Sequence, residues 1–112
     1  MDNQRVDVII PFYNQKDFLV RCLSSIQVQT ISDDINVTII DDCSDENIND
    51  IIAFFKRFLN INVLHLNRNK GPGYARQLGI DITSAPYICF IDADDIFENA
   101  YAVEYMRGLM LV

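Results

Sequence analysis

Short apolar runs alternate along the chain with longer stretches in which apolar residues recur at helical spacing. The runs over residues 6–10, 36–40, 63–66 and 87–91 have the length of strands and are rich in β-branched and aromatic residues. Each run therefore predicts a strand. The last run lies between Pro86 and an acidic cluster, and its unbroken apolar character predicts a strand that is buried on both faces.

The stretches between these runs predict three amphipathic helices. Apolar residues recur every three or four positions over about residues 15–29, 48–59 and 75–82, with polar residues between them. Asp45 or Asn47 is expected to cap the second helix, because both residue types accept hydrogen bonds from free amides at a helix start.

The predicted order is β-α-β-α-β-α-β, which indicates an α/β, Rossmann-like fold with a mostly parallel sheet and helices on both faces. The polar clusters follow the strands, so they belong to the carboxyl edge of the sheet, where open α/β sheets bind ligands. We therefore expect four loops, residues 11–14, 41–45, 67–73 and 92–95, to converge on one rim.

The end of the chain carries apolar residues without polar cover. Tyr101, Tyr105, Leu109 and Val112 are roughly helically spaced, and the last five residues contain no polar ending signal. We expect residues 1–112 to form one unit that is cut from a larger domain after the acidic cluster. Exposed as a patch, the segment is expected to drive self-association.

Composition narrows the classes of function. The chain has 112 residues, of which 50% are hydrophobic and 22% charged, as in a globular domain rather than a disordered one. Nine Lys and Arg against sixteen Asp and Glu give a net charge of −7. This charge argues against nucleic-acid binding, which depends on phosphate contacts. It also means that a phosphorylated ligand needs local cations.

The cysteines and the hydropathy of the chain indicate the cellular compartment in which it is expected. Three cysteines without a C-x-x-C spacing argue against a disulfide framework and against a zinc site. Cys22 and Cys89 lie among apolar residues and are expected in the core. The chain has no signal-peptide core and no apolar run of about 18 residues. We expect a cytoplasmic location, which includes the inner face of the membrane.

The acidic cluster Asp92-Ala93-Asp94-Asp95 places three carboxylates within four positions. Carboxylates this close repel one another, and a divalent cation with oxygen ligands relieves the repulsion. If the extended backbone continues past the strand, Asp92 and Asp94 point the same way and Asp95 turns away. The alternative is a solvated acidic turn.

Other polar residues have two interpretations each. Asp41 and Asp42 follow a strand and either contact a base, a ribose or a metal, or form a turn and helix start. Tyr13 either stacks on a ligand or covers the sheet edge. His65, the one histidine, lies within an apolar run and is expected to be structural, so no Ser-His-Asp arrangement is predicted.

The loop after the third predicted strand combines glycines with cations. Gly71 and Gly73 lie between Lys70 and Arg76, and a helix starts nearby. Glycine lets backbone amides approach a ligand closely, and a helix start carries partial positive charge, so the loop suits an anionic group. Its spacing fits neither a Walker loop nor a dinucleotide-binding fingerprint. The alternative is a plain loop that leads into a helix.

Five stretches resemble, in order and spacing, the family 2 glycosyltransferases of the GT-A fold. They are residues 6–14, 24–30, 39–45, 69–79 and 90–95. The third matches the second-strand motif, although the family commonly has Gly where Cys43 stands, and the last resembles the DXD motif. The resemblance covers nearly all of this chain but only the nucleotide-binding half of the family's domain.

The resemblance implies roles for particular residues. Pro11 and its neighbours, Asp42 and Arg76 would line a uridine pocket, with Asp42 near the base. Asp92 and Asp94 would hold Mn²⁺ or Mg²⁺ bridging the diphosphate. The implied donor-binding residues are Pro11, Phe12, Tyr13, Asp42, Gly71, Arg76, Asp92, Ala93 and Asp95, with Asp95 adjoining the donor sugar.

The resemblance also implies an activity, namely metal-dependent, inverting transfer of a sugar from a UDP-sugar to a saccharide, lipid or protein hydroxyl, as in polysaccharide biosynthesis. The catalytic base is expected beyond Val112, so the 112-residue chain alone is expected to be inactive. One alternative is a non-catalytic nucleotide-binding remnant. Another is a phosphoacceptor signalling domain, which needs an acidic pair where this chain has Phe12-Tyr13-Asn14.

Overall fold

The computed structural model describes residues 4–110 and contains one parallel four-stranded sheet, in the order β3-β2-β1-β4. In chain order the elements are β1 (Val6–Phe12), α1 (Lys16–Gln27), a short 3₁₀ turn (Ser32–Asp34), β2 (Ile35–Asp41), α2 (Asn49–Phe55), β3 (Asn60–His65), α3 (Pro72–Ile82), β4 (Tyr87–Phe90) and α4 (Ala102–Met110).

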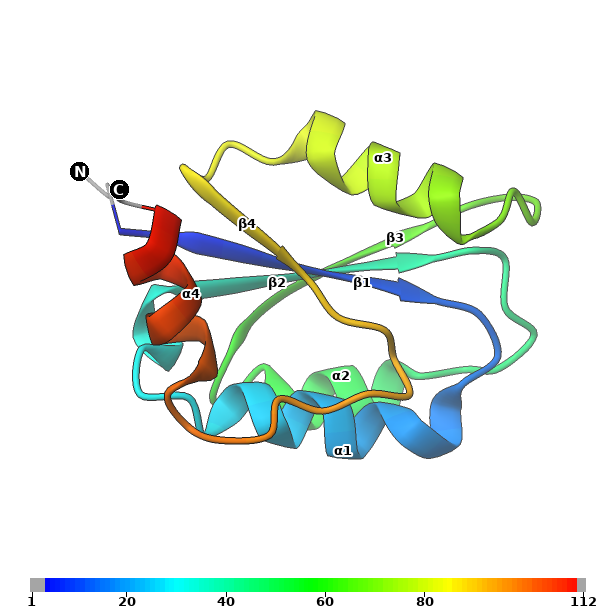
Figure 1. Ribbon diagram of the computed structural model, residues 1–112. Helices are drawn as coiled ribbons and strands as arrows, with labels where there is room; N and C mark the ends of the chain where they lie inside the picture. Colours follow the sequence, from blue (N-terminus) through cyan, green and yellow to red (C-terminus); the bar gives the residue numbers. More distant parts are fainter. Residues whose placement is uncertain (1–3, 111–112) are drawn as a thin grey trace.

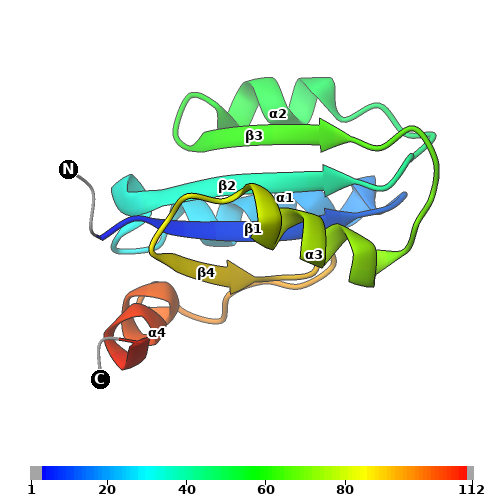
Figure 2. The same ribbon diagram turned by 90° about the horizontal axis from the view of Figure 1, so that it is seen from above.

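The helices cover both faces of the sheet. Helices α1 and α2 lie on one face and α3 on the other (Figure 1). The chain steps from β1 to β2 to β3 in one direction and then crosses back to β4, which lies beside β1 (Figure 2). Right-handed crossovers therefore place α3 opposite the first two helices. The predicted α/β fold is confirmed.

Strand β1 is the centre of the core, and all seven of its residues are buried. Its even-numbered residues pack with α1 and α2, whereas Ile9 packs on the other face with Ile40 and Ala75. The prediction that this strand ends before Pro11 was wrong, since pairing with β2 continues to Phe12.

The position of its missing N–H explains why Pro11 is tolerated in a central strand. The Phe12 carbonyl accepts a hydrogen bond from Asp42 N, so even-numbered residues of β1 bond toward β2 and odd-numbered ones toward β4. Pairing with β4 stops at Ile9. The missing N–H of Pro11 therefore lies on the β4 side, beyond the last residue that pairs with β4, so it interrupts neither pairing of β1.

Strand β4 corrects a second expectation. Its faces are not both buried as predicted, because within it only Cys89 is buried and Phe90 is 41% exposed. In the described sheet it is also an edge strand. An apolar run of strand length does not specify whether a neighbour lies on one side or both. The return crossover from β3 determines that β4 takes the outer position.

The chain after β4 runs back along α1 and ends in α4, near the amino ends of the strands (Figures 1 and 2). Buried Gln29 holds this return, since its amide nitrogen donates to Asn99 O (2.8 Å) and its oxygen accepts from Val103 N (3.1 Å). No helix in residues 4–110 is long and apolar enough to cross a membrane.

Helix α4 leaves part of the predicted apolar segment uncovered. Tyr101, Tyr105 and Leu109 are each more than half exposed. Leu111 and Val112 lie outside the described residues.

Candidate functional site

A cavity of about 470 Å³ opens at the carboxyl edge of the sheet, where the strand order reverses between β1 and β4. Its lining residues are Pro11, Phe12, Tyr13, Gln15, Asp42, Asn69, Gly71, Pro72, Ala75, Arg76, Asp92 and Asp94. Every one of the four predicted rim loops contributes, so their expected convergence is confirmed. Such a reversal point is where open α/β sheets bind ligands.

The structure brings together most of the predicted site residues but not all. Ala93 is fully buried in the core, and Asp95 lines an adjoining hollow with Arg76 and Phe97 instead of the main cavity. Sequence analysis missed Gln15, which lies outside the five motifs. Asn69, Pro72 and Ala75 were missed as well, although all three lie in the motif at residues 69–79.

The three carboxylates of the acidic cluster converge. One oxygen from each of Asp92, Asp94 and Asp95 lies within 4.8 Å of the others, and all three residues are exposed. The backbone forms a turn closed by Asp95 N donating to Asp92 O (2.9 Å). The expectation that Asp95 turns away was wrong, because it assumed an extended backbone.

The spacing of these oxygens suits a hard divalent cation. Divalent ions of this kind bind oxygen ligands at about 2.0 to 2.6 Å. Three oxygens within 4.8 Å of one another can therefore contact one ion placed between them after small side-chain rotations. Three carboxylates also supply the charge that such an ion prefers, so the residues present fit a divalent metal.

The positively charged side chain of Arg76 contacts this cluster. Nη2 of Arg76, on α3, donates to Asp92 Oδ1 at 3.2 Å, and both side chains are about half exposed. A solvated pair of this kind contributes little to stability, about 0–1 kcal/mol. It does place a guanidinium group beside the predicted metal position.

Asp42 is 3% exposed and holds the glycine-containing loop. Its Oδ1 accepts from Lys70 N (2.7 Å) and its Oδ2 from Gly71 N (2.8 Å). Its carbonyl accepts from the side-chain amide of Asn69 at 3.3 Å. Both carboxylate oxygens retain a second acceptor position, so contact with a ligand remains compatible with these bonds.

Gly71 precedes α3 in a conformation that side chains disfavour. Its φ of 91° and ψ of 161° fall in a region used almost only by glycine. Pro72 follows at the first helical position, where no N–H is required. The Gly71 carbonyl accepts from Ala75 N, so this glycine starts the helix while its own N–H points to Asp42.

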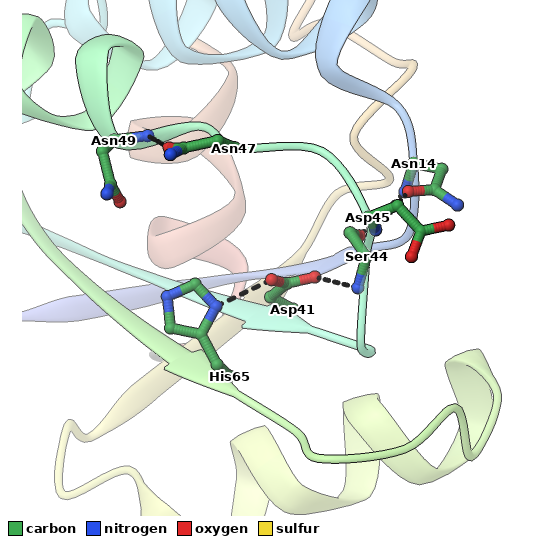
Figure 3. A network of polar contacts seen from close by, with 7 residues as sticks. All are labelled: Asn14, Asp41, Ser44, Asp45, Asn47, Asn49 and His65. Atoms are coloured by element: carbon green, nitrogen blue, oxygen red, sulfur yellow. Dashed lines mark hydrogen bonds and ion pairs between the residues drawn. The ribbon is translucent and has the colours of Figure 1, made fainter.

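Asp41 builds a separate network on the α2 side of the sheet (Figure 3). Its Oδ2 lies 2.7 Å from Nδ1 of His65, and its Oδ1 accepts from Ser44 N at 3.0 Å. Pairing with buried Asp41 agrees with a structural role for His65. The imidazole is nevertheless largely exposed, because β3 is an edge strand.

The turn after β2 is also tied to the loop after β1. Asn14 N donates to Ser44 Oγ and Asp45 N donates to Asn14 Oδ1, both at 2.9 Å (Figure 3). Neither predicted helix cap is the N-cap of α2, which is Ile48, although Asn47 just before it accepts from Asn49 N at 2.8 Å. These bonds fix the rim where Tyr13 enters the cavity.

The cysteines occupy two kinds of environment. Cys22 and Cys89 are buried, as predicted, and Cys43 is exposed. Burial raises the pKa of the Cys22 thiol to about 12, with the negative charges of the acidic cluster adding to the effect. Burial alone raises the pKa of Cys89 to about 11. Neither buried thiol is a nucleophile near neutral pH.

Residues 7–110 match the sequence model of Glycosyl transferase family 2. A Rickettsia bellii glycosyltransferase is 40% identical over 93 residues, which cover 83% of this chain and 13% of the relative. The S. aureus TarS fragment in complex with UDP has a TM-score of 0.86 at 26% identity, over 95% of this chain and 32% of that one. The same fragment is also known in complex with UDP-GlcNAc.

A more distant match shares the fold. The mannosyltransferase PcManGT from Pyrobaculum calidifontis, in complex with GDP-Man and Mn²⁺, has a TM-score of 0.77 at 20% identity. It is matched over 86% of this chain and 29% of its own. This chain therefore spans less than a third of the length of either structure.

Proposed function

The chain belongs to glycosyl transferase family 2, and from this we propose that it supplies the donor- and metal-binding half of a sugar transferase. The donor is a nucleotide-diphosphate sugar, namely a UDP-sugar. The acceptor is a hydroxyl group of a saccharide, a lipid or a protein. The sugar is transferred with inversion at its anomeric carbon.

One observation supports the proposal, namely that a single cavity combines an acidic turn with a positively charged side chain. Asp92 and Asp94 form one side, and Arg76 on α3 forms the other. A diphosphate with a divalent cation complements both sides at once. On an acidic chain, a diphosphate needs such a cation near these carboxylates. The UDP complex of TarS, whose fold this chain shares, supports uridine as the nucleoside.

The residues divide the work of binding. Asp92 and Asp94 would hold Mn²⁺ or Mg²⁺, which would supply a Lewis acid for the negative charge of the diphosphate. Arg76 contributes a second positive charge to the diphosphate. Tyr13, 47% exposed at the rim, offers a face for the base. Asp95 borders the donor sugar from the adjoining hollow.

The acceptor side of the reaction requires further groups. Inverting transfer needs a carboxylate within hydrogen-bond reach of the acceptor hydroxyl, opposite the leaving diphosphate. Among the described residues, the carboxylates at the cavity are Asp42, which accepts from the Lys70 and Gly71 amides, and Asp92 and Asp94, which we assign to the metal. We therefore assign the base to a part of the protein outside residues 4–110.

The strand order rules out the phosphoacceptor alternative. Signalling domains of that class have the order 2-1-3-4-5, whereas this sheet has β3 and β1 on either side of β2. The non-catalytic alternative shares the donor site with the enzyme and differs only in turnover, so the experiment must measure both binding and transfer.

The test combines calorimetry with a turnover assay. UDP is expected to bind in Mn²⁺ and to lose affinity in EDTA. Asp94→Asn should weaken metal-supported binding several-fold by removing one charged ligand, whereas Asp50→Asn, an exposed aspartate on α2, should not. Equal UDP affinity with and without EDTA would contradict the metal role.

Transfer is measured as UDP release from several UDP-sugars, with and without candidate acceptors, in the full-length protein. Acceptor-dependent release supports the transferase. Binding without release supports the non-catalytic remnant.

A further inference from the structure

The carboxylate of Asp42 is engaged by one short segment of chain. Successive backbone amides, Lys70 and Gly71, donate to its two oxygens at 2.7 and 2.8 Å. Asp42 is 3% exposed, so its charge depends on these bonds for stabilisation in place of water. Hydrogen bonds to an ionised acceptor are about twice as strong as neutral ones. Asp42 is therefore an anchor for this segment.

The anchored segment determines where α3 begins. The glycine-only conformation of Gly71 lets its N–H reach Asp42 while its carbonyl accepts from Ala75 N, the first bond of the helix. Ala75 and Arg76 then line the cavity. Arg76 reaches Asp92 from this helix at 3.2 Å. One carboxylate thus fixes the segment that carries the cationic wall of the cavity.

We propose that Asp42 is a positioning residue, which holds the amino end of α3 in the donor-binding arrangement through the Lys70 and Gly71 amides. The inference rests on the proposed donor-binding function. It assigns Asp42 a role different from contact with the base. A base contact discriminates between nucleotides, whereas an anchor increases the binding of every nucleoside diphosphate by raising the fraction of competent protein.

The first variant is Asp42→Asn, which keeps the shape of the side chain but turns one acceptor into an NH₂ group facing a backbone N–H. Its affinity for UDP, GDP and ADP should fall about tenfold in each case, with the ratios between them unchanged, if the competent fraction drops to about a tenth. Hydrogen exchange at the Lys70 and Gly71 amides, followed by NMR without nucleotide, should accelerate.

Gly71→Ala tests the same anchor from the other partner. An added Cβ meets no protein atom within 4 Å, so in the nucleotide-free protein the effect on exchange comes from the backbone conformation. Gly71→Ala should also lower nucleotide affinity and accelerate amide exchange. The double variant should bind nucleotide as tightly as whichever single variant has the lower affinity. Asp45→Asn is the matched control, because it removes the same charge from an exposed position in the same turn.

Two outcomes overturn the proposal. Unchanged exchange at both amides in Asp42→Asn excludes the anchor, whatever nucleotide binding does. A changed preference for UDP over GDP with unchanged exchange assigns Asp42 to base contact alone. These outcomes differ from a failure of the proposed function. In that case the unmodified protein binds none of the three nucleotides, and the exchange experiment still tests the anchor.

Discussion

Asp41 and Asp42 are neighbours in the chain, yet their carboxylates serve opposite faces of the sheet. Asp41 bonds to His65 and Ser44 beside α2, and Asp42 bonds to the loop that leads into α3. The alternation of side chains along a strand produces this division. The two residues therefore have different partners, so the effect of substituting one does not predict the effect of substituting the other.

At the same scale, the Arg76–Asp92 pair makes a prediction about metal affinity. A bound ion and the Arg76 guanidinium compete for the charge of Asp92. Removing one positive charge about 6 Å from a divalent site in water should raise Mn²⁺ affinity of nucleotide-free protein on the order of tenfold. Arg76→Gln should show this gain in a calorimetric titration, together with weaker UDP binding. Arg21→Gln on α1 is the control, and equal Mn²⁺ affinity in all three proteins would refute the competition.

The buried thiols predict a dependence of stability on pH. The pKa of the Cys89 thiol is 9.0 in the unfolded chain and about 11 in the folded protein. Its contribution to the free energy of unfolding is therefore fully present below pH 9 and is lost as the pH rises toward 11. Between pH 8 and 10 the loss is about 1 kcal/mol for one thiol. Urea unfolding of Cys89→Ala should therefore show a smaller decline than the unmodified protein over this interval. Parallel declines would argue against the raised pKa.

At the scale of elements, the approach of α3 to the sheet depends on Gly79. A Cβ there would lie 2.6 Å from Cγ2 of buried Ile9, which cannot move aside because it is attached to the branched carbon. Gly79→Ala should destabilise the protein by about 1–3 kcal/mol and weaken UDP binding, since α3 carries Arg76. Thermal unfolding measures the first effect and calorimetry the second.

Two further variants make the Gly79 test specific. Gly108→Ala lies in α4, where an added Cβ meets no atom within 4 Å, so it should be neutral or stabilising. Ile9→Ala removes the side-chain atoms that clash with the added Cβ. In that background, Gly79→Ala should lower the free energy of unfolding only slightly further. A full, additive cost in that background would show that the packing contact is not the cause.

Most elements were predictable, because β1, β2 and β4 contain short apolar runs and α1 to α3 each have their own periodicity. Strand β3 begins at Asn60, before the predicted run at residues 63–66, and α4 was not among the predicted helices. In two places, prediction failed because of an interaction between distant residues. Pro11 ends a strand by local rules, but here its missing N–H faces an unpaired side. The apolar residues 87–91 indicate burial, but the return crossover places β4 at an edge.

The candidate site was predictable in outline for a similar reason. Parallel strands bring their carboxyl ends to one edge, so the convergence of four loops follows from element order alone. The bonds from Lys70 and Gly71 to Asp42 do not, because these residues are 28 and 29 positions away and donate from the backbone. The approach of Asp95 to Asp92 depends on a turn, whereas the geometry expected for Asp95 assumed that the extended backbone continues past the strand.

At the scale of the whole molecule, the outer face of α4 predicts self-association of this chain. Tyr101, Tyr105 and Leu109 form an apolar surface on the described part of α4 and the turn before it, beside two shallow hollows. Leu109→Lys should lower the apparent mass in light scattering at high concentration. Ile80→Lys, an exposed apolar residue on α3, should leave it unchanged. A monomeric unmodified chain would contradict the prediction.

The position of β4 beside β1 has a consequence for the order of folding. These strands pair from Val6 and Tyr87 onward, so the fourth strand of the described sheet closes on the first. During synthesis, the edge of β1 that faces β4 stays open until residues 87–90 have emerged. Pairings between such distant segments form slowly, because a long loop must close first. We expect the Arg76–Asp92 contact to appear among the last events of folding, after the turn of Asp41 and Asp42 has formed.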